Sequence, residues 1–213
     1  MTEMGITEAV NGWQEAGSCG GCLVVVRHGM TAWNVERRLQ GRTDIPLNSV
    51  GLRQAADVAA ALRDLAGIAA VYSSPLSRAL QTARVIGESL GLDVQVWSDL
   101  TERAYGVLES LTHDEMDRLF PHRRDEGVPG LEPAGMLRQR AVGVMERVVG
   151  RHVGEVAVVV SHGALINAFL YVLSGARLGT GVTQLSNGGI SVVWRWADSW
   201  HLGVVNATTH LSV

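Results

Sequence analysis

Two short apolar runs, residues 22–26 and 156–160, constrain the fold most, because a His-Gly pair closely follows each of them. Both runs have the length and the β-branched content that are typical of a strand buried on both faces. Strands of this kind belong to α/β sheets, which bind their ligands beyond the carboxyl ends of the strands. We therefore expect His28 and His162 to converge at one edge of a sheet.

The rest of the chain alternates between helix and strand patterns. Helices are expected over 50–66, 75–90, 112–120, 134–151 and 163–173, with Asn48 or Ser49, Ser74 and Thr112 as capping residues. Further strands are expected over 68–72, 94–97, 183–185, 190–195 and 200–204. This alternation predicts an α/β fold, a three-layer sandwich with a mainly parallel central sheet flanked by helices.

The N-terminal residues 1–21 show no clear periodicity and end in a glycine-rich patch. They are expected to form a flexible tail before a single domain over 22–213. Cys19 and Cys22 form a C-x-x-C motif, but the sequence offers no second cysteine pair to complete a zinc site. The first residues lack a basic segment, so a signal peptide is not expected, and the few cysteines fit a reducing, cytoplasmic location.

Composition excludes several classes of function. The net charge of −3 gives no electrostatic attraction to nucleic acid or to an anionic membrane, so neither is expected as a partner. All 18 basic residues are arginine, which excludes a Walker-type phosphate loop and a lysine Schiff base. The most apolar stretch, 156–173, is interrupted by polar residues and does not resemble a membrane span. The sequence leaves open whether the chain forms a homo-oligomer.

Three consecutive residues at the end of the first strand suit phosphate chemistry. Arg27 offers a planar fork of donors that matches a phosphate group. His28 can be a nucleophile near neutral pH, and Gly29 lets the backbone turn sharply. Arg78, in the first turn of a helix, could bind the same phosphate or be a solvated charge. His162 could donate to this phosphate or be a core histidine with satisfied hydrogen bonds.

The sequence from Arg27 to Asn34, Arg-His-Gly-x-Thr-x-Trp-Asn, resembles the opening signature of the histidine phosphatase superfamily, which includes the phosphoglycerate-mutase-like enzymes. The segment Ser-Ser-Pro-Leu-Ser-Arg around Arg78 and the segment around Glu102 are similar to two further motifs of that family. The resemblance covers about residues 23–203 and implies a phosphoglycerate mutase-like fold.

The resemblance implies a phosphomonoesterase that forms a phosphohistidine on His28. Arg27, Arg78 and His162 would then bind the transferring phosphate, and Glu102 would be the proton shuttle. The residues expected to contact the substrate, a small phosphorylated metabolite, are Arg27, Thr31, Asn34, Gln40, Gly41, Arg78, Tyr105 and Gly163. No metal or other cofactor is expected, since the arginines supply the positive charge.

Two alternatives remain open, a phosphoglycerate mutase and a non-catalytic module that binds a phosphorylated ligand. Mutases of the cofactor-dependent type carry a long insertion before the second histidine, with a lysine and paired arginines for the substrate carboxylate. This chain has a short segment there, with Arg123 and Arg124 but no lysine. A binding module would have lost the histidine or the acid, and neither is lost. Met30 and Ser110 depart from the residues that many family members carry at these positions.

Overall fold

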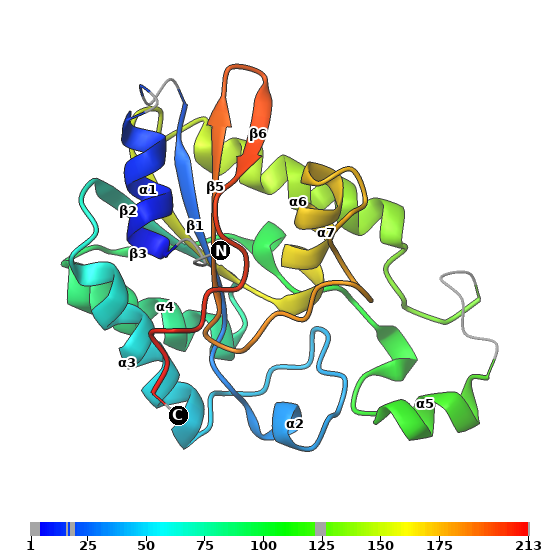
Figure 1. Cartoon of the computed structure of the whole chain (residues 1–213). Coiled ribbons are helices and arrows are strands. Elements are labelled where there is room, and N and C mark those ends of the chain that lie inside the picture. Colours follow the sequence, from blue (N-terminus) through cyan, green and yellow to red (C-terminus); the bar gives the residue numbers. More distant parts are fainter. Residues whose placement is uncertain (1–4, 16, 18–19, 122–126, 213) are drawn as a thin grey trace.

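A six-stranded sheet forms the centre of the protein, in a computed structural model that describes residues 5–15, 17, 20–121 and 127–212 (Figure 1). The strand order is β3-β2-β4-β1-β5-β6. Strands β3, β2, β4 and β1 are parallel, β5 is antiparallel to β1, and β6 is antiparallel to β5. The strands are β1 (Cys22–Arg27), β2 (Ile68–Ser73), β3 (Val94–Val96), β4 (Val156–Ser161), β5 (Ile190–Trp196) and β6 (Ser199–Leu202).

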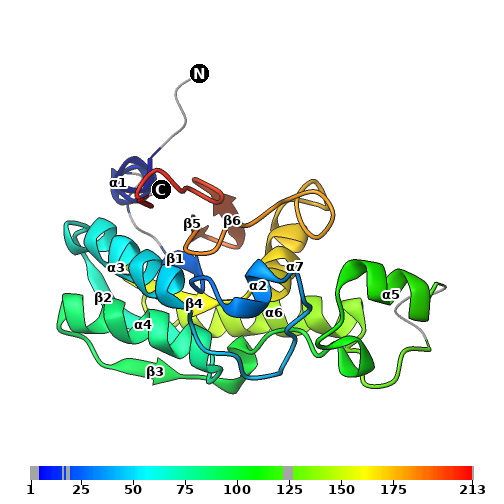
Figure 2. The same ribbon diagram turned by 90° about the horizontal axis from the view of Figure 1, so that it is seen from below.

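Helices cover both faces of this sheet. The longer ones are α1 (Ile6–Glu15), α3 (Ser49–Arg63), α4 (Ser77–Leu90), α6 (Ala134–Val149) and α7 (Gly163–Leu173). Short elements are α2 (Ala32–Val35), α5 (His113–Leu119) and the 3-10 turns η1 (Ser98–Leu100) and η2 (Gly106–Leu108). Figures 1 and 2 show α1, α3 and α4 on one side of the sheet and α6 and α7 on the other.

The side chains of β1 alternate between the two layers of helices. Leu23 and Val25 belong to one buried cluster with α6 and α7, whereas Cys22, Val24 and Val26 belong to a second cluster with α1, α3 and α4. This alternation follows from the period of two along a strand. It explains the continuous apolar runs and confirms the expected three-layer sandwich.

The register of β1 against β4 brings the two His-Gly strand ends together. These strands pair in parallel, and Arg27 lies opposite Ser161. His28 directly follows the first residue of this pair and His162 the second. The backbone N–H of His28 donates to the carbonyl of Ser161 over 3.0 Å. The expected convergence of the two histidines is therefore confirmed.

Residues 6–15, which were expected to belong to a flexible tail, form the helix α1. Its buried side chains Ala9, Val10 and Trp13 pack into the cluster beside α3 and α4, with Ile6 partly buried against it. These four residues follow the i, i+3, i+4, i+7 spacing of an amphipathic helix, a signal that the sequence analysis missed. Cys22 is a free, buried thiol in β1, and burial raises its pKa to about 12; Cys19 lies outside the described residues.

The start of α4 differs from the prediction that placed Ser74 as its cap. The helix begins at Ser77, and Ser74 instead accepts the backbone N–H of Leu76 over 3.2 Å. Asp44, from a distant loop, accepts both the backbone N–H and the hydroxyl of Ser77, each over 2.7 Å. A tertiary contact thus satisfies the helix terminus, which local sequence cannot reveal. Arg78 still lies in the first helical turn, as expected.

The strand expected over 183–185 is absent, and these residues form a loop. The backbone carbonyl of Leu185 accepts a hydrogen bond from the Arg27 guanidinium instead of joining a strand ladder. The other expected elements are present within a few residues, and Thr112 caps α5 in a capping box with Glu115. Within the described ranges, no helix is both long and apolar enough to cross a membrane.

Candidate active site

A pocket of about 640 Å³ lies at the carboxyl edge of the parallel strands. Nine of the residues that line it were predicted from the sequence: Arg27, His28, Asn34, Gln40, Gly41, Arg78, Glu102, Tyr105 and Gly163. His162 is fully buried and contacts His28, with 5.2 Å between the ring centroids. The structure therefore gathers residues from four separate parts of the chain at one site.

His28 lines the pocket and has one ring nitrogen atom available for reaction. Its Nδ1 lies 2.7 Å from the carbonyl oxygen of Gly29. Since a carbonyl can only accept, Nδ1 carries the hydrogen, and Nε2 has a free lone pair. Burial, followed by the charges of Arg78 and Arg27, lowers the pKa of His28 well below 6.5, while the bond to Gly29 opposes this shift. The imidazole is thus neutral and nucleophilic at neutral pH.

The turn after His28 is fixed by close backbone packing. A Cβ atom on Gly29 would lie 2.5 Å from the carbonyl oxygen of Gly51 at the start of α3, so only glycine fits. The Gly29 N–H donates to the Thr82 hydroxyl over 3.1 Å. Asn187, which the sequence analysis did not identify, donates its side-chain amide to the carbonyls of His28 and Gly29 over 3.0 and 3.3 Å.

Two arginines bring unused donors to the pocket. Arg78 is fully buried, and its two terminal nitrogens donate to the carbonyls of Gly41 and Thr43 over 2.7 and 2.9 Å. The buried Nε atoms of Arg78 and Arg27 have no hydrogen-bond partner among the described residues. Burial lowers the pKa of both side chains, and the nearby charge of Glu102 opposes this. An anion in the pocket would satisfy these donors.

His162 is a third group with unused capacity. Both of its ring nitrogens are buried and lack a partner among the described residues. Burial lowers the pKa of His162 well below 6.5, and the charge of Arg78 adds to the effect. A buried polar group without a partner costs free energy, so its persistence points to a ligand. The alternative of a core histidine satisfied by its neighbours therefore finds no support among the described residues.

These depressed pKa values make stability depend on pH. A histidine whose pKa is lower in the folded state takes up a proton on unfolding, so the stability present above pH 6.5 is lost as the pH falls. We expect the free energy of unfolding to fall as the pH decreases below about 6.5, by up to about 1.4 kcal/mol per pH unit for each residue. Denaturant titrations across this range would measure the slope.

The double variant His28→Gln/His162→Gln should lose most of this slope. His210, whose pKa is lowered by burial, accounts for a remaining part. The same slope in the double variant and in the unmodified protein would show that neither active-site histidine causes the pH dependence.

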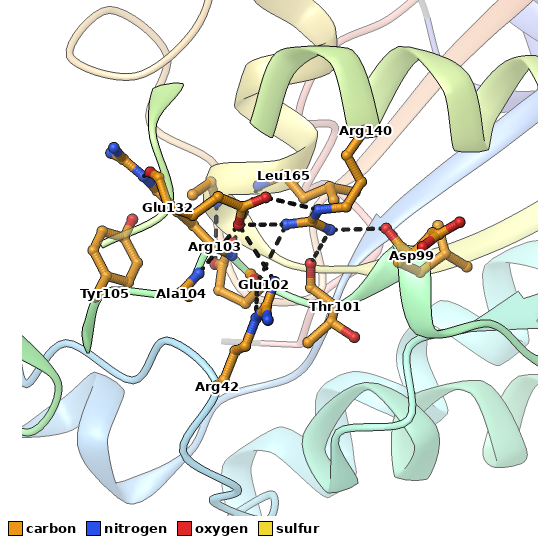
Figure 3. Close-up of polar contacts among 12 residues, drawn as sticks. Arg42, Asp99, Thr101, Glu102, Arg103, Ala104, Tyr105, Glu132, Arg140 and Leu165 are labelled. Carbon is orange, nitrogen blue, oxygen red and sulfur yellow. Dashed lines mark hydrogen bonds and ion pairs between the residues drawn. The ribbon is translucent and has the colours of Figure 1, made fainter. Parts of the chain in front are cut away.

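Glu102 lies in the irregular segment between η1 and η2. Its Oε1 accepts the backbone N–H groups of Arg103 and Leu165 over 2.8 and 3.2 Å, and its Oε2 accepts that of Ala164 over 3.1 Å (Figure 3). The two donors from the first turn of α7 have no partner within that helix. The carboxylate is therefore fixed at the pocket wall, beside the helix that begins after His162.

Thr31 and Asn187 orient two of the amide side chains that line the pocket, Asn34 and Gln40. The hydroxyl of Thr31 accepts the Asn34 N–H over 3.2 Å and donates to Gln40 over 3.0 Å. The side-chain oxygen of Asn34 accepts the Thr31 N–H and the Asn187 amide over 3.0 and 3.2 Å, so the Asn34 amide nitrogen is left for a ligand. Thr31 itself is buried and does not line the pocket; it orients two residues that do.

Glu109 fastens the loop that contributes Gly41. Its carboxylate accepts the backbone N–H groups of Arg42 and Thr43 over 3.0 and 2.9 Å and the Thr43 hydroxyl over 2.6 Å. Burial opposes the shift, but these bonds lower the pKa of Glu109. Gly41 has φ +53, and a Cβ atom there would lie 2.2 Å from Glu109. Glu109 therefore shapes the loop and does not line the pocket.

The two departures from the family pattern lie beside the pocket, not in it. Met30 donates its backbone N–H to Gln54 over 2.8 Å and does not line the pocket. Ser110 has φ +74, the left-handed conformation that costs non-glycine residues about 1–2 kcal/mol. A glycine at position 110 would relieve this strain.

Other pocket residues lacked any signal in the sequence. They come from the turn after α2, from α5, from α7 and from the loop before β5: Arg37, Arg38, Leu39, His113, Ala164, Asn167, Thr180, Gln184 and Leu185. Arg123 and Arg124 lie outside the described residues. Within the described residues, no group of three or more His, Cys, Asp or Glu side chains could hold a metal ion.

Comparison with known proteins agrees with this geometry. The model of the histidine phosphatase superfamily (branch 1) matches residues 23–208. A Bacillus subtilis protein named uncharacterized phosphatase PhoE is 35% identical over 190 residues, 89% of this chain and 96% of that protein. The metal-independent phosphoserine phosphatase of Arabidopsis thaliana is 33% identical, covering 89% of this chain and 83% of that protein.

Among solved structures, phosphoserine phosphatase from Entamoeba histolytica in complex with 3-phosphoglyceric acid has a TM-score of 0.79 at 27% identity. The similarity covers 90% of this chain and 100% of that one. These relatives support a phosphatase function. The chain belongs to branch 1 of the histidine phosphatase superfamily.

Proposed function

We propose that this protein hydrolyses a small phosphorylated metabolite through a phosphohistidine intermediate on His28. The observation that carries the proposal is a set of unused buried donors around a neutral histidine. Arg27, Arg78 and His162 each have a buried nitrogen atom without a described partner, and Arg27 and Arg78 line the pocket. A phosphate group supplies several acceptor oxygens and the negative charge that two guanidinium groups would neutralise.

In the first step, Nε2 of His28 attacks the phosphorus atom of the bound monoester. The N–P bond forms as the bond from phosphorus to the alcohol oxygen breaks. Arg27 and Arg78 stabilise the charge on the equatorial oxygens, and a ring N–H of His162 donates to one of them. Glu102 in its protonated form gives its proton to the departing alcohol oxygen.

In the second step, water attacks the phosphorus atom of the phosphohistidine. The carboxylate of Glu102 accepts a proton from this water as the new P–O bond forms and the N–P bond breaks. Inorganic phosphate leaves, and both His28 and Glu102 return to their starting states. Each group is thus used twice, and no other reactant is needed.

We propose that the reaction needs no metal ion. Arg27 and Arg78 supply the positive charge that a divalent cation supplies in many phosphoryl-transfer enzymes. A relative at 33% identity is named a metal-independent phosphoserine phosphatase, which supports this part of the proposal.

The substrate that we propose is a small metabolite with a polar organic part. Arg37, His113, Asn167 and Gln184 add polar side chains to the pocket beyond the phosphate-binding groups. Relatives named for phosphoserine, and one solved in complex with 3-phosphoglyceric acid, make these two compounds the first candidates.

A substrate panel tests the proposed function. Phosphate release from phosphoserine, 3-phosphoglycerate, sugar phosphates and nucleoside monophosphates would be compared as kcat/KM, with excess EDTA throughout. We expect full activity in EDTA on at least one of these compounds. Activity that is lost in EDTA and restored by Mg²⁺ or Zn²⁺ would refute metal independence. Isomerisation of 3-phosphoglycerate without phosphate release would identify a mutase, and binding without turnover would identify a ligand-binding module.

A further inference from the structure

We propose that Arg140 and Glu132 act as a positioning pair that holds Glu102 where it can transfer its proton, an inference that rests on the proposed function. Neither residue lines the pocket. Arg140 comes from α6, and Glu132 lies in the loop that precedes this helix. Their side chains are only 16% and 11% exposed, and both form hydrogen bonds with the backbone of the segment that carries Glu102 (Figure 3).

All five donor hydrogens of the Arg140 guanidinium have an acceptor. Its Nε and Nη2 form a bidentate pair with the carboxylate of Glu132, over 2.9 and 2.8 Å. Its Nη1 donates to the carbonyls of Asp99 and Thr101 over 2.8 and 2.6 Å, and Nη2 also donates to the carbonyl of Glu102 over 3.4 Å. The planar guanidinium therefore binds backbone carbonyls from Asp99 to Glu102, the proposed general acid.

Glu132 binds the same segment at the residues that follow Glu102 in the chain. Its Oε2 accepts the backbone N–H of Ala104 over 3.2 Å, and its own N–H donates to the Ala104 carbonyl over 2.8 Å. The carbonyl of Glu132 accepts the Arg103 side-chain Nε over 2.8 Å. Arg140 and Glu132 thus bind the backbone of residues 99–104 both before and after Glu102, and Arg42 adds a longer contact to Glu132 over 3.6 Å and to the Glu102 carbonyl over 3.5 Å.

This arrangement matters because Glu102 has no regular secondary structure to fix it. Residues 101–104 belong neither to a helix nor to a strand. The carboxylate of Glu102 is bound by the first turn of α7, whereas Arg140 from α6 binds its backbone carbonyl. Helices α6 and α7 pack in one buried cluster, so both anchors rest on the same rigid layer.

A purely structural ion pair would share this geometry, so the test needs a measurement that stability alone does not change. A displaced proton donor slows the departure of a poor leaving group much more than that of a good one. We would therefore measure phosphoenzyme formation in single turnovers with an alkyl phosphate and with p-nitrophenyl phosphate. The ratio of the two rate constants reports on proton donation.

The variant Arg140→Lys keeps the charge beside Glu132 but cannot reproduce the five-donor fork. We expect the alkyl phosphate to lose at least about tenfold in rate, with a much smaller loss for p-nitrophenyl phosphate, because small displacements of catalytic groups are costly. Glu132→Gln should shift the ratio in the same direction and gives a second variant if the first fails to fold. In a Glu102→Gln background, Arg140→Lys should not change the ratio further.

Arg147→Lys is the matched control. Arg147 lies on the same helix and binds the side chain of Asp99, but it is 53% exposed and makes no contact with the Glu102 backbone. Its replacement should leave the ratio unchanged. If Glu102→Gln shifts the ratio and Arg140→Lys lowers both rates equally, the positioning role is refuted and the proposed function stands. If Glu102→Gln itself leaves the ratio unchanged, both the acid assignment and the positioning role are refuted.

Discussion

The variant His28→Ala is expected to lose turnover of every phosphomonoester, by more than about 10³-fold in kcat. The reason is that the first step forms a bond to Nε2 of His28, and no other described nucleophile is held in its place. The arginines remain, so the variant should still bind inorganic phosphate. Steady-state phosphate release, together with a binding titration, would separate these two effects.

His201→Ala is the control for this experiment. His201 lies exposed on β6, where its ring stacks on Trp194 with 5.9 Å between the centroids. Its loss should leave turnover unchanged. A His28→Ala variant that folds, binds phosphate and still turns over at a substantial rate would remove His28 from the nucleophile's role.

The second large effect is expected for Glu102→Gln, and its size should depend on the leaving group. A general acid typically contributes about 10²–10⁴-fold, and it matters most when the alcohol leaves poorly. Phosphoenzyme formation from an alkyl phosphate should therefore slow far more than formation from p-nitrophenyl phosphate. Single turnovers are needed, because Glu102 also serves as the base in the second step.

The variant Glu109→Gln tests whether Glu109, the next glutamate along the chain, is the proton donor instead of Glu102. Glu109 is bonded to the loop at Arg42 and Thr43 and does not line the pocket, so its loss should affect both substrates alike. Equal losses for the two substrates in Glu102→Gln, with a leaving-group dependence in Glu109→Gln, would transfer the acid role to Glu109.

The sequence predicted the centre of this site because the relevant residues sit at strand ends. A parallel sheet places consecutive strand ends at one edge, so Arg27, His28 and His162 had to converge once the strands were recognised. The expectation for Arg78 and Glu102 depended on the family resemblance, since an arginine on a helix or a glutamate in a loop is usually solvated.

The residues that the sequence did not reveal act through tertiary contacts. Asn187 fixes the turn at His28 from a loop that follows α7, and Asp44 caps a helix that begins far along the chain. Glu132 and Arg140 look like ordinary surface charges in the sequence, because only the packing of α6 against the Glu102 segment buries them. A local sequence pattern does not show which residues far apart in the chain will contact one another.

The missed helix α1 had a different cause. Its amphipathic spacing is present in the sequence, but the glycines around it weakened the pattern. The helix is stabilised by burial of Trp13 and its neighbours against the sheet layer, which tertiary packing supplies and local propensity does not.

The most direct measurement of the central claim is the identity of the phosphorylated atom. Rapid quenching of the enzyme with a radiolabelled phosphomonoester should trap an acid-labile, base-stable label, and peptide mapping should place it on His28. Because Nδ1 of His28 donates to the Gly29 carbonyl, the phosphate should be attached to Nε2. A label on another residue, on Nδ1 of His28, or no label during active turnover would contradict the mechanism.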